Sequence, residues 1–257
     1  METIVIAVVA FIASGLTFFS GFGLGTILLP AFALFFPIEI AISLTAIVHF
    51  LNNIFKLTLV GKNVHWKTVL LFGIPATVFA FVGAKTLNLL TEVPTAIEFD
   101  FLGKALVTNW MKIIIGSLLI LFSLFDIIPT LKKMKFNEKL LPIGGILSGF
   151  FGGLSGHQGA LRSAFLMKLP ITKEQFIASG IFIACCIDIS RLSVYSNSNV
   201  FAHSSININI LAIATVAAFT GAFLGNKLVN KITIDILHKI VALLIVVFSI
   251  CMILGIV

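Results

Sequence analysis

Charged residues are scarce in this sequence of 257 residues. Asp, Glu, Lys and Arg together make up only 11% of it, against 59% hydrophobic residues, and the mean hydropathy is +1.17. A soluble domain of this size covers its surface with far more charge. The composition therefore excludes a soluble enzyme or binding domain and predicts an integral membrane protein.

The usual patterns of catalytic and metal sites are also missing. Cys185, Cys186 and Cys251 lie in apolar runs without metal-site spacing, so we interpret them as small buried hydrophobic residues. There is no HExxH, GxSxG or GxxxxGK[ST] motif and no acidic cluster suited to a two-metal site. We expect no catalytic residues, no metal and no cofactor, in a protein that is not an enzyme.

Acidic residues are few, and the excess of basic ones gives a net charge of +7. These basic residues gather in short loops between apolar runs, notably at 132–139, where they set the orientation of a membrane protein. No nucleic-acid motif accompanies them. The lipid bilayer is therefore an expected partner, and nucleic acid is not.

Long apolar runs are what the sequence has in abundance. Six of them approach or exceed the roughly 20 residues that cross a bilayer: 39–59, 67–90, 108–128, 173–195, 206–228 and 235–256. Two further apolar stretches, 3–36 and 140–169, are interrupted by glycine clusters. The prediction is an all-α polytopic protein with eight apolar segments in a single membrane domain, 1–257.

The two halves of the chain resemble each other weakly. "SGLTFFSGFGLG" at 14–25 aligns with "SGFFGGLSGHQGA" at 148–160 with a one-residue gap, and each is followed by a proline-led apolar segment. Duplication of this kind is common in transporters. We therefore predict two repeats of four segments, 1–131 and 140–257, joined by a basic cytoplasmic loop at 132–139.

The lysines favour one of two topologies. If both interrupted stretches cross the membrane, the loop lysines divide seven against eight between the two faces, which violates the usual cytoplasmic excess. If both turn back at their glycines as re-entrant hairpins, the division is twelve against three and the halves are inverted. As one helix, 3–36 would be roughly 50 Å long, too long for a simple span. We expect inverted repeats, each with a glycine-broken, re-entrant first segment.

The glycine clusters at the two interruptions are candidates for an anion site. Broken helices are tolerated at membrane depth only where the freed backbone groups line a cavity or are buried in protein. Glycine lets the backbone approach a ligand, and helix N-termini present free N–H groups. The candidate substrate-binding residues here are Ser20, Gly21, Gly23, Gly25, Ser155, Gly156, His157, Gln158 and Gly159. The alternative is close helix packing, which we prefer for Gly15, Gly83 and Gly149.

Arg162 is the most informative single residue. An arginine at bilayer depth is costly and usually faces a partner, a cavity or the interface, and its planar fork suits an oxyanion. It is either a substrate ligand or an interface residue near Lys168, and both interpretations stay open. His157 could carry a coupling proton or simply bind a freed carbonyl group.

The second segment of each repeat carries a polar group near its end. These groups comprise His49, Asn52, Asn53 and Lys56 in the first repeat, and Asp188 and Arg191 in the second. Asp188 and Arg191 share a helix face and are expected to neutralise each other. We predict substrate contact for Asn52 and Asn53, and coupling or charge pairing for the other four.

Several of these motifs resemble the sulfite exporter TauE/SafE family of permeases. They are "SGFGLGTILLPAF" at 20–32, "LSGHQGALRSAF" at 154–165, and the stretch with Asn52, Asn53 and Lys56. The resemblance covers essentially the whole chain and implies transport of sulfite, another sulfur oxyanion or an organosulfonate, without ATP hydrolysis by the chain. Family members tend to carry a second glycine-rich run where this chain has Gln158, Ala160 and Arg162. The resemblance therefore implies a substrate class and not a compound.

Together the patterns favour a transporter in the cell (plasma or inner) membrane. It would carry a small anionic substrate by alternating access around the two glycine tips, with protons as a candidate coupling ion. An anion channel would need a continuous polar lining along its pore, whereas these polar residues concentrate at one depth in the membrane. A non-transporting membrane scaffold subunit is a third hypothesis. The sequence leaves the direction of transport open and is compatible with a homo-oligomer.

Overall fold

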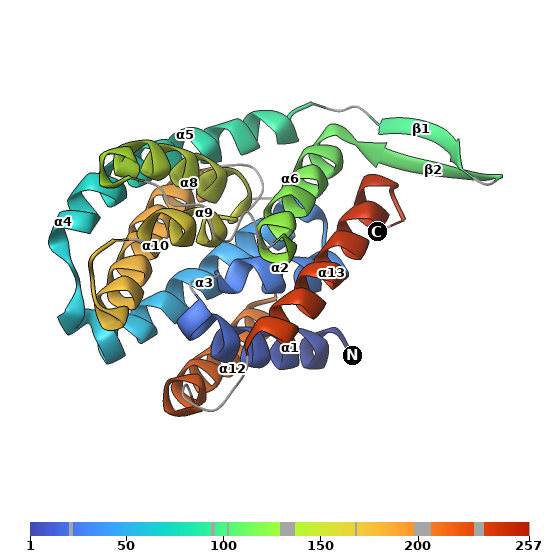
Figure 1. Cartoon of the computed structure of the whole chain (residues 1–257). Coiled ribbons are helices and arrows are strands. Elements are labelled where there is room, and N and C mark those ends of the chain that lie inside the picture. The colour runs from blue at the N-terminus through green and yellow to red at the C-terminus, as the bar shows by residue number, and fades with distance from the viewer. Residues whose placement is uncertain are drawn as a thin grey trace.

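Helices make up most of the chain in the computed structural model, which describes residues 1–20, 23–93, 96–101, 103–128, 137–167, 169–197, 207–228 and 234–256 (Figure 1). The first half contains α1 (Glu2–Ser20), α2 (Leu24–Ala33), α3 (Ile38–Val60), α4 (Trp66–Thr68), α5 (Ile74–Thr91) and α6 (Trp110–Ile127). A 3₁₀ turn (Gly61–Asn63) follows α3, and a π-helical turn (Val69–Gly73) joins α4 to α5. The second half contains α8 (Leu141–Ser155), α9 (Gly159–Leu166), α10 (Lys173–Tyr195), α12 (Ile208–Leu228) and α13 (Ile234–Ile253), with a 3₁₀ turn (Glu138–Leu140) before α8.

Four helical stretches in the described ranges are long and apolar enough to cross a membrane, judged by length and composition. They are Ile38–Asn63, Trp66–Thr91, Lys173–Tyr195 and Ile208–Lys227. Their positions match four of the six predicted spans closely. The structure thus agrees with a helical membrane protein.

One element departs from the all-α prediction. Strands β1 (Ala96–Phe101) and β2 (Lys104–Asn109) form an antiparallel hairpin that projects from the helices (Figure 1). Gly103 at its tip has φ +76°, a left-handed conformation that favours glycine. The alternation of Ile97, Glu98, Phe99 and Asp100 is the two-residue period of a strand, a signal that the sequence analysis missed.

Each interrupted stretch consists of two helices that pack against each other. In the second half, α8 ends at Gly156 (φ +82°), whose N–H donates to the carbonyl of Gly152. The chain then reverses, and α9 runs back along α8. A Cβ on Gly144 of α8 would accordingly lie 2.5 Å from the ring of Phe165, near the far end of α9. Ser148 Oγ also donates to the carbonyl of Gln158 at 3.0 Å. The helices α8 and α9 therefore form a tight hairpin whose tip is Gly156–Gln158.

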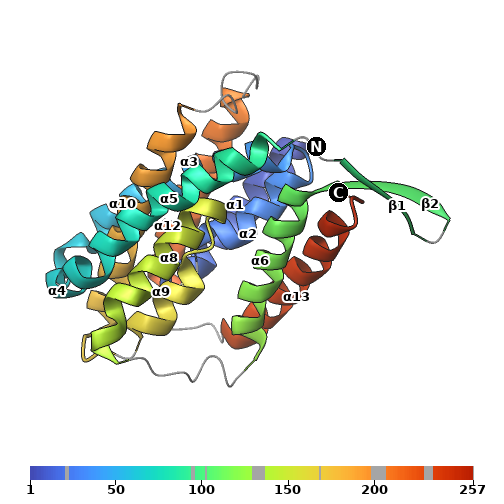
Figure 2. The same ribbon diagram turned by 90° about the horizontal axis from the view of Figure 1, so that it is seen from above.

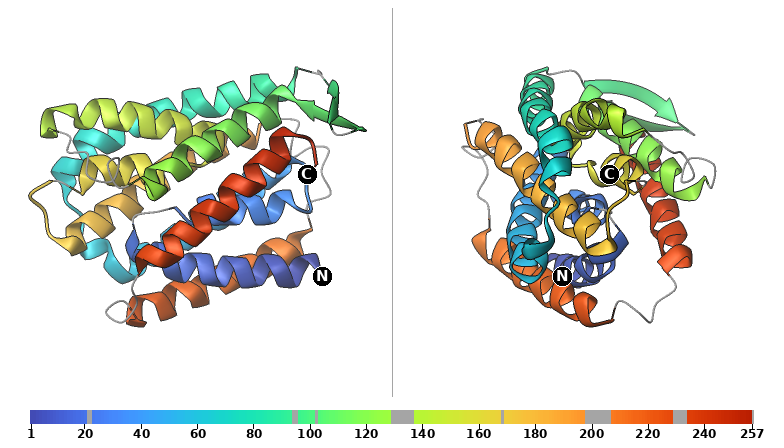
Figure 3. Two further views of the ribbon diagram at one scale, coloured as in Figure 1. Left: turned by 45° about the vertical axis from the view of Figure 1, so that its right-hand side comes forward. Right: turned by 60° about the vertical axis from the view of Figure 1, so that its left-hand side comes forward.

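Glycines bring two further helix pairs into backbone contact. A Cβ on Gly149 of α8 would lie 2.0 Å from the carbonyl oxygen of Ala76 at α5, and one on Gly83 of α5 would lie 2.0 Å from that of Phe150. In the pair α1 and α12, a Cβ on Gly15 would lie 3.1 Å from the carbonyl oxygen of Gly221. Figure 3 shows both pairs running side by side. The packing interpretation of Gly15, Gly83 and Gly149 is therefore confirmed.

The remaining helices complete the bundle around an antiparallel central pair. Helices α3 and α10 contact each other, and α6 packs against α13 beside the others (Figure 2). The start of α10 is fixed by a capping box, in which Thr172 Oγ1 accepts from the Gln175 N–H and Gln175 Oε1 accepts from the Thr172 N–H. The N–H of His65, just after α3, donates to Ser179 Oγ at 2.8 Å. The end of α3 and the start of α10 therefore lie at the same end of the bundle.

Some predictions fall on residues that the structure does not describe. Gly21 and most of the basic loop, residues 132–136, lie outside the described ranges, as does Lys168. The side chain of Ser20, the last residue of α1, is likewise outside the description. These positions stay predictions from the sequence.

Candidate functional site

The two glycine interruptions meet in the interior of the molecule. A Cβ on Gly25, in the first turn of α2, would lie 3.5 Å from the carbonyl oxygen of Gly156 at the tip of the α8–α9 hairpin. A Cβ on Gly23 would lie 3.4 Å from Nε2 of His49. The sequence placed these glycines 131 or more residues apart. The fold thus brings the predicted tips together and sets them against α3.

A buried carboxylate ties the two halves together beside these tips. Asp188 of α10 is fully buried and lies 2.6 Å from Nδ1 of His49 on α3. Asn53 Nδ2 donates to the same oxygen at 3.2 Å. The other oxygen accepts from Nε of Arg191 at 3.0 Å and from Nε2 of Gln158 at 3.5 Å. One carboxylate therefore links α3, α10 and the hairpin tip.

The predicted pair of Asp188 and Arg191 is present, but the network is wider than the sequence indicated. Nη2 of Arg191 lies 2.8 Å from the carboxylate. Because a carboxylate can only accept, His49 must present a protonated Nδ1 to it. Four partners surround the buried carboxylate and satisfy its oxygens, which is the condition for tolerating a buried charge.

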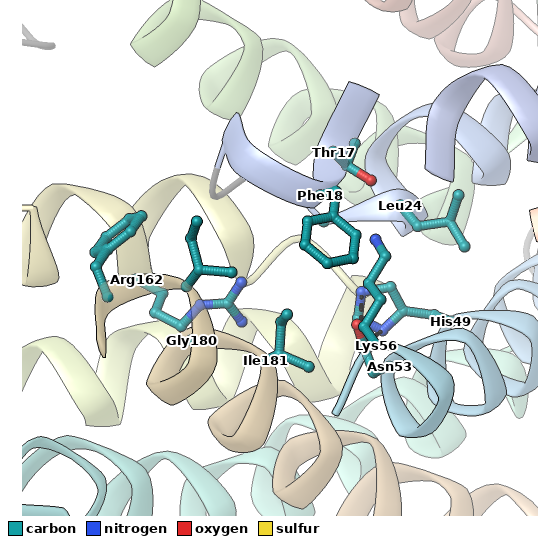
Figure 4. Close-up of a pocket in the computed structure, with 12 residues that line it drawn as sticks. Thr17, Phe18, Leu24, His49, Asn53, Lys56, Arg162, Gly180 and Ile181 are labelled. Atoms are coloured by element: carbon teal, nitrogen blue, oxygen red, sulfur yellow. Dashed lines mark hydrogen bonds between the residues drawn. The ribbon is translucent and has the colours of Figure 1, made fainter. Parts of the chain in front are cut away.

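A pocket lies against this network, between α1, α3, α9 and α10 (Figure 4). Its empty space is about 400 Å³, the open mouth included. The polar part of the lining comprises Thr17, Gly23, His49, Asn53, Lys56 and Arg162, and the apolar part includes Phe18, Phe176, Ile177 and Ile181. Of the predicted site residues, the structure gathers Gly23, His49, Asn53, Lys56 and Arg162 around this pocket.

Two buried cations face the pocket from opposite sides of Phe18 (Figure 4). Lys56 is 3% exposed and its Nζ lies 5.4 Å from the centre of the Phe18 ring, a cation–π contact. Arg162 is 6% exposed, and its Nη1 lies 3.4 Å from Oε1 of Gln158, one helical turn earlier. The side chain of Arg162 therefore points into the protein and does not extend to the surface.

The buried charges of the described residues do not cancel. They are three cations, Lys56, Arg162 and Arg191, and one carboxylate, Asp188. An excess of buried positive charge is unfavourable, and a bound anion would reduce it.

Thr17 is a pocket residue that the sequence analysis missed. Its side chain is 5% exposed, and Oγ1 has no hydrogen-bond partner among the described residues. A buried hydroxyl without a partner is unfavourable unless a ligand or water completes it. The only signal in the sequence was a hydroxyl group in the apolar run just before the first interruption.

The other predicted residues whose side chains the structure describes do not line the pocket. In the orientation that gives both the oxygen and the nitrogen of its amide a partner, Asn52 accepts from Nζ of Lys56 at 3.2 Å and donates to the carbonyl of Ala218 at 3.2 Å. Asn52 thus fixes the position of the Lys56 ammonium group without lining the pocket itself. Gly159 starts α9.

Ser155 and His157 lie on the other side of the hairpin tip. Ser155 Oγ donates to the carbonyl of Phe151 at 3.1 Å and lies 3.1 Å from Nδ1 of His157. The imidazole ring stacks on Phe122 of α6 with centres 6.0 Å apart. His157 is 2% exposed and does not line the pocket.

The pocket lies toward one end of the central helix pair. Its α10 residues, Phe176 to Ile181, belong to the first turns of that helix, and Lys56 precedes the end of α3 by four residues. Arg191 lies four residues before the opposite end of α10. The pocket is therefore off-centre along the axis of the bundle.

Comparison with known proteins gives one match. The sequence model of the family described as "Sulfite exporter TauE/SafE" matches residues 6–252, nearly the whole chain. No curated protein and no solved structure matches the chain.

Proposed function

Because this chain belongs to the sulfite exporter TauE/SafE family, a family of membrane exporters, we propose that it carries sulfite or a related sulfur oxyanion or organosulfonate through the pocket between its glycine tips. The observation that carries this proposal is the pair of buried cations, Lys56 and Arg162, on one small pocket. The membrane would be the cell (plasma or inner) membrane, with a small anion as the substrate.

The chemistry of the pocket suits an oxyanion. Arg162 offers a planar fork of N–H donors, and Lys56 a compact ammonium group. Thr17 adds a hydroxyl without a partner among the described residues, and Asn53 an amide. Backbone approach at Gly23 is unobstructed by a side chain. Lys56, Arg162, Thr17 and Asn53 are therefore the proposed substrate ligands.

Alternating access is the mechanism that we propose, with the two repeats inverted and both hairpins re-entrant. Support comes from the contacts between the two halves. When each helix is replaced by its counterpart in the other half, the same pairs of helices are in contact. The contact of α1 with α12 corresponds to that of α8 with α5, and α3 with α12 corresponds to α10 with α5. Such pairing is typical of inverted-repeat transporters, which bind substrate between the repeats and rock around it.

A channel is less well supported than a transporter. The tips of the two interrupted stretches are in contact at Gly25 and Gly156, and the Asp188 network lies beside them. In this arrangement the pocket has packed protein beyond it, as a carrier facing one side requires. Proton coupling through His49 remains part of the proposal, since its ring lines the pocket while Nδ1 contacts Asp188.

Uptake into proteoliposomes tests the proposed function. Labelled sulfite, thiosulfate and a small organosulfonate are presented to the wild-type protein and to Arg162→Ala and Lys56→Met. We expect saturable flux of at least one anion and a loss of about tenfold or more in each variant, since each removes a charged donor.

Lys85→Met is the matched control for Lys56→Met. Lys85 also lies over a phenylalanine, 4.7 Å from the centre of the Phe81 ring, but on α5 and away from the pocket. Its substitution should leave flux within twofold of the wild type, a change of less than about 0.5 kcal/mol. Absence of flux for all three anions with folded protein would contradict the proposed function, and flux that does not saturate would favour a channel.

A further inference from the structure

Three buried polar atoms that do not line the pocket have no hydrogen-bond partner among the described residues. They are Oγ1 of Thr45, Nε2 of His157 and Nη1 of Arg191. Each side chain is at most 2% exposed. The proposed substrate pocket uses none of them, so their lack of partners calls for a separate explanation.

The positions of these atoms follow from the antiparallel central helices. Along α3, Thr45 lies one turn before His49, whereas Lys56 lies two turns after it. Along α10, Arg191 lies beyond Asp188, whereas the pocket residue Ile181 precedes it by two turns. Thr45 and Arg191 therefore both lie toward the end of the bundle opposite to the pocket.

Each of the three side chains lies beside a glycine of the tip contact. A Cβ on Gly25 would lie 3.5 Å from both Cγ2 of Thr45 and the carbonyl oxygen of Gly156. A Cβ on Gly156 would lie 2.8 Å from Nη1 of Arg191. His157 follows Gly156 directly and interacts electrostatically with Arg191. Thr45, His157 and Arg191 thus each lie next to Gly25 or Gly156, the two glycines in contact at the tips.

Their chemistry matches an oxyanion that bears a hydroxyl group. The Thr45 hydroxyl and the Arg191 guanidinium can both donate to anionic oxygens. The Ser155 hydroxyl donates to the Phe151 carbonyl, so Nδ1 of His157 donates to Ser155 and Nε2 is left as an acceptor. Two donors and one acceptor fit a singly protonated oxyanion such as hydrogen sulfite.

We propose that Thr45, His157 and Arg191 form a second anion station, which receives the substrate on the far side of the tips from the Lys56–Arg162 pocket. The inference rests on the proposed transport function. It gives Arg191 a role in substrate binding in addition to its ion pair with Asp188. Arg191 holds the place in α10 that Lys56 holds in α3, each four residues before the end of its helix. The two stations are thus centred on matching cations.

Sulfite transport measured separately from each side tests the second station. Wild type, Thr45→Val, His157→Phe and Arg191→Lys are reconstituted in one orientation, and the half-saturating sulfite concentration is determined at each face. Thr45→Val removes only the hydroxyl, His157→Phe can keep the ring stack on Phe122, and Arg191→Lys keeps a charge for Asp188. Each should raise the half-saturating concentration about tenfold at the face where α10 ends.

Thr108→Val is the matched control. Thr108 of β2 is 4% exposed and its hydroxyl also lacks a partner among the described residues, but it lies in the β-hairpin. Thr108→Val should leave the half-saturating sulfite concentration unchanged at both faces. At the face where α3 ends, Thr45→Val should change the half-saturating concentration less than about threefold, which corresponds to a change in binding free energy below about 1 kcal/mol.

Two outcomes would overturn the second station while leaving the proposed function intact. In the first, sulfite is transported and Thr45→Val behaves like Thr108→Val at both faces. In the second, Thr45→Val weakens sulfite equally at both faces, which would place the hydroxyl in a single shared site. If Arg191→Lys fails to fold, Thr45→Val and His157→Phe decide the question. Failure of the proposed function is distinct, because the wild type would then show no flux.

Discussion

The central helices α3 and α10 occupy matching places in the two halves but carry their charges differently. Each has a cation four residues before its end, Lys56 in α3 and Arg191 in α10. Three residues earlier, α10 has the carboxylate Asp188 where α3 has the neutral amide of Asn53. Arg191 is therefore paired with a carboxylate of its own helix, whereas Lys56 is not.

This difference assigns separate tasks to the two helices. Asp188 collects His49, Asn53 and Arg191 into a buried network that joins the halves. Nζ of Lys56 donates to the amide oxygen of Asn52 and lies over the ring of Phe18. Neither contact neutralises its charge. The carboxylate of α10 thus anchors the two halves, whereas Lys56 of α3 has no carboxylate partner among the described residues. Thermal unfolding in detergent tests this division, and the expected effects decrease from Asp188→Asn through Gly156→Ala to Asn53→Ala.

Asp188→Asn removes the anchor and should have the largest effect on stability. It leaves Arg191 and His49 without the carboxylate that they share, and an unpaired buried charge costs about 3 kcal/mol. The midpoint of thermal unfolding should fall by roughly 10 °C. Asp100→Asn, at an exposed position of the β-hairpin, is the control and should leave the midpoint unchanged. Equal midpoints for the two variants would show that Asp188 is not the anchor.

Gly156→Ala should have an intermediate effect. Its φ of +82° is strained for alanine by about 1–2 kcal/mol, and the new methyl group would press on Nη1 of Arg191. We expect the unfolding midpoint to fall by roughly 6 °C. Gly25→Ala is the matched variant on the other tip, where the methyl group would meet only ordinary contacts at 3.5 Å. A loss at Gly25 as large as that at Gly156 would contradict the described geometry of the tips.

Asn53→Ala should have the smallest effect of the three. It removes one hydrogen bond to Asp188 but leaves His49 and Arg191 in place, so the loss is about 1.5 kcal/mol. The midpoint should fall by roughly 4 °C. Asn63→Ala, at an exposed position just after α3, should not shift it. If Asn53→Ala destabilised the protein as much as Asp188→Asn, the proposed contrast between the two helices would be wrong.

Much of the helical framework could be predicted from the sequence, because a helix depends on local composition. The span predicted at 173–195 coincides with α10, and the interruptions at the two glycine clusters coincide with the breaks between α1 and α2 and between α8 and α9. The β-hairpin was missed, since most of its paired residues were read as a connection between spans, and Thr108 and Asn109 as the start of the span predicted at 108–128.

The candidate site was predicted less completely. Arg162, Lys56 and the glycine tips could be singled out because polar residues and glycines are conspicuous in apolar segments. The surroundings of each residue could not. Thr17 looked like one more hydroxyl in an apolar helix, and Thr45 was not distinguished at all. Both become notable only when the structure leaves their hydroxyl groups buried without a partner among the described residues.

The sequence alone determined that this is a helical membrane protein of the TauE/SafE family, because hydropathy, glycine placement and family motifs are properties of local stretches. Tertiary structure decided which polar groups share a site. His49 and Asp188 are 139 residues apart and yet lie 2.6 Å from each other. Lys56 and Arg162, from different halves, line one pocket. Such contacts depend on how separate helices pack, and no local pattern in either helix specifies its partner across the bundle.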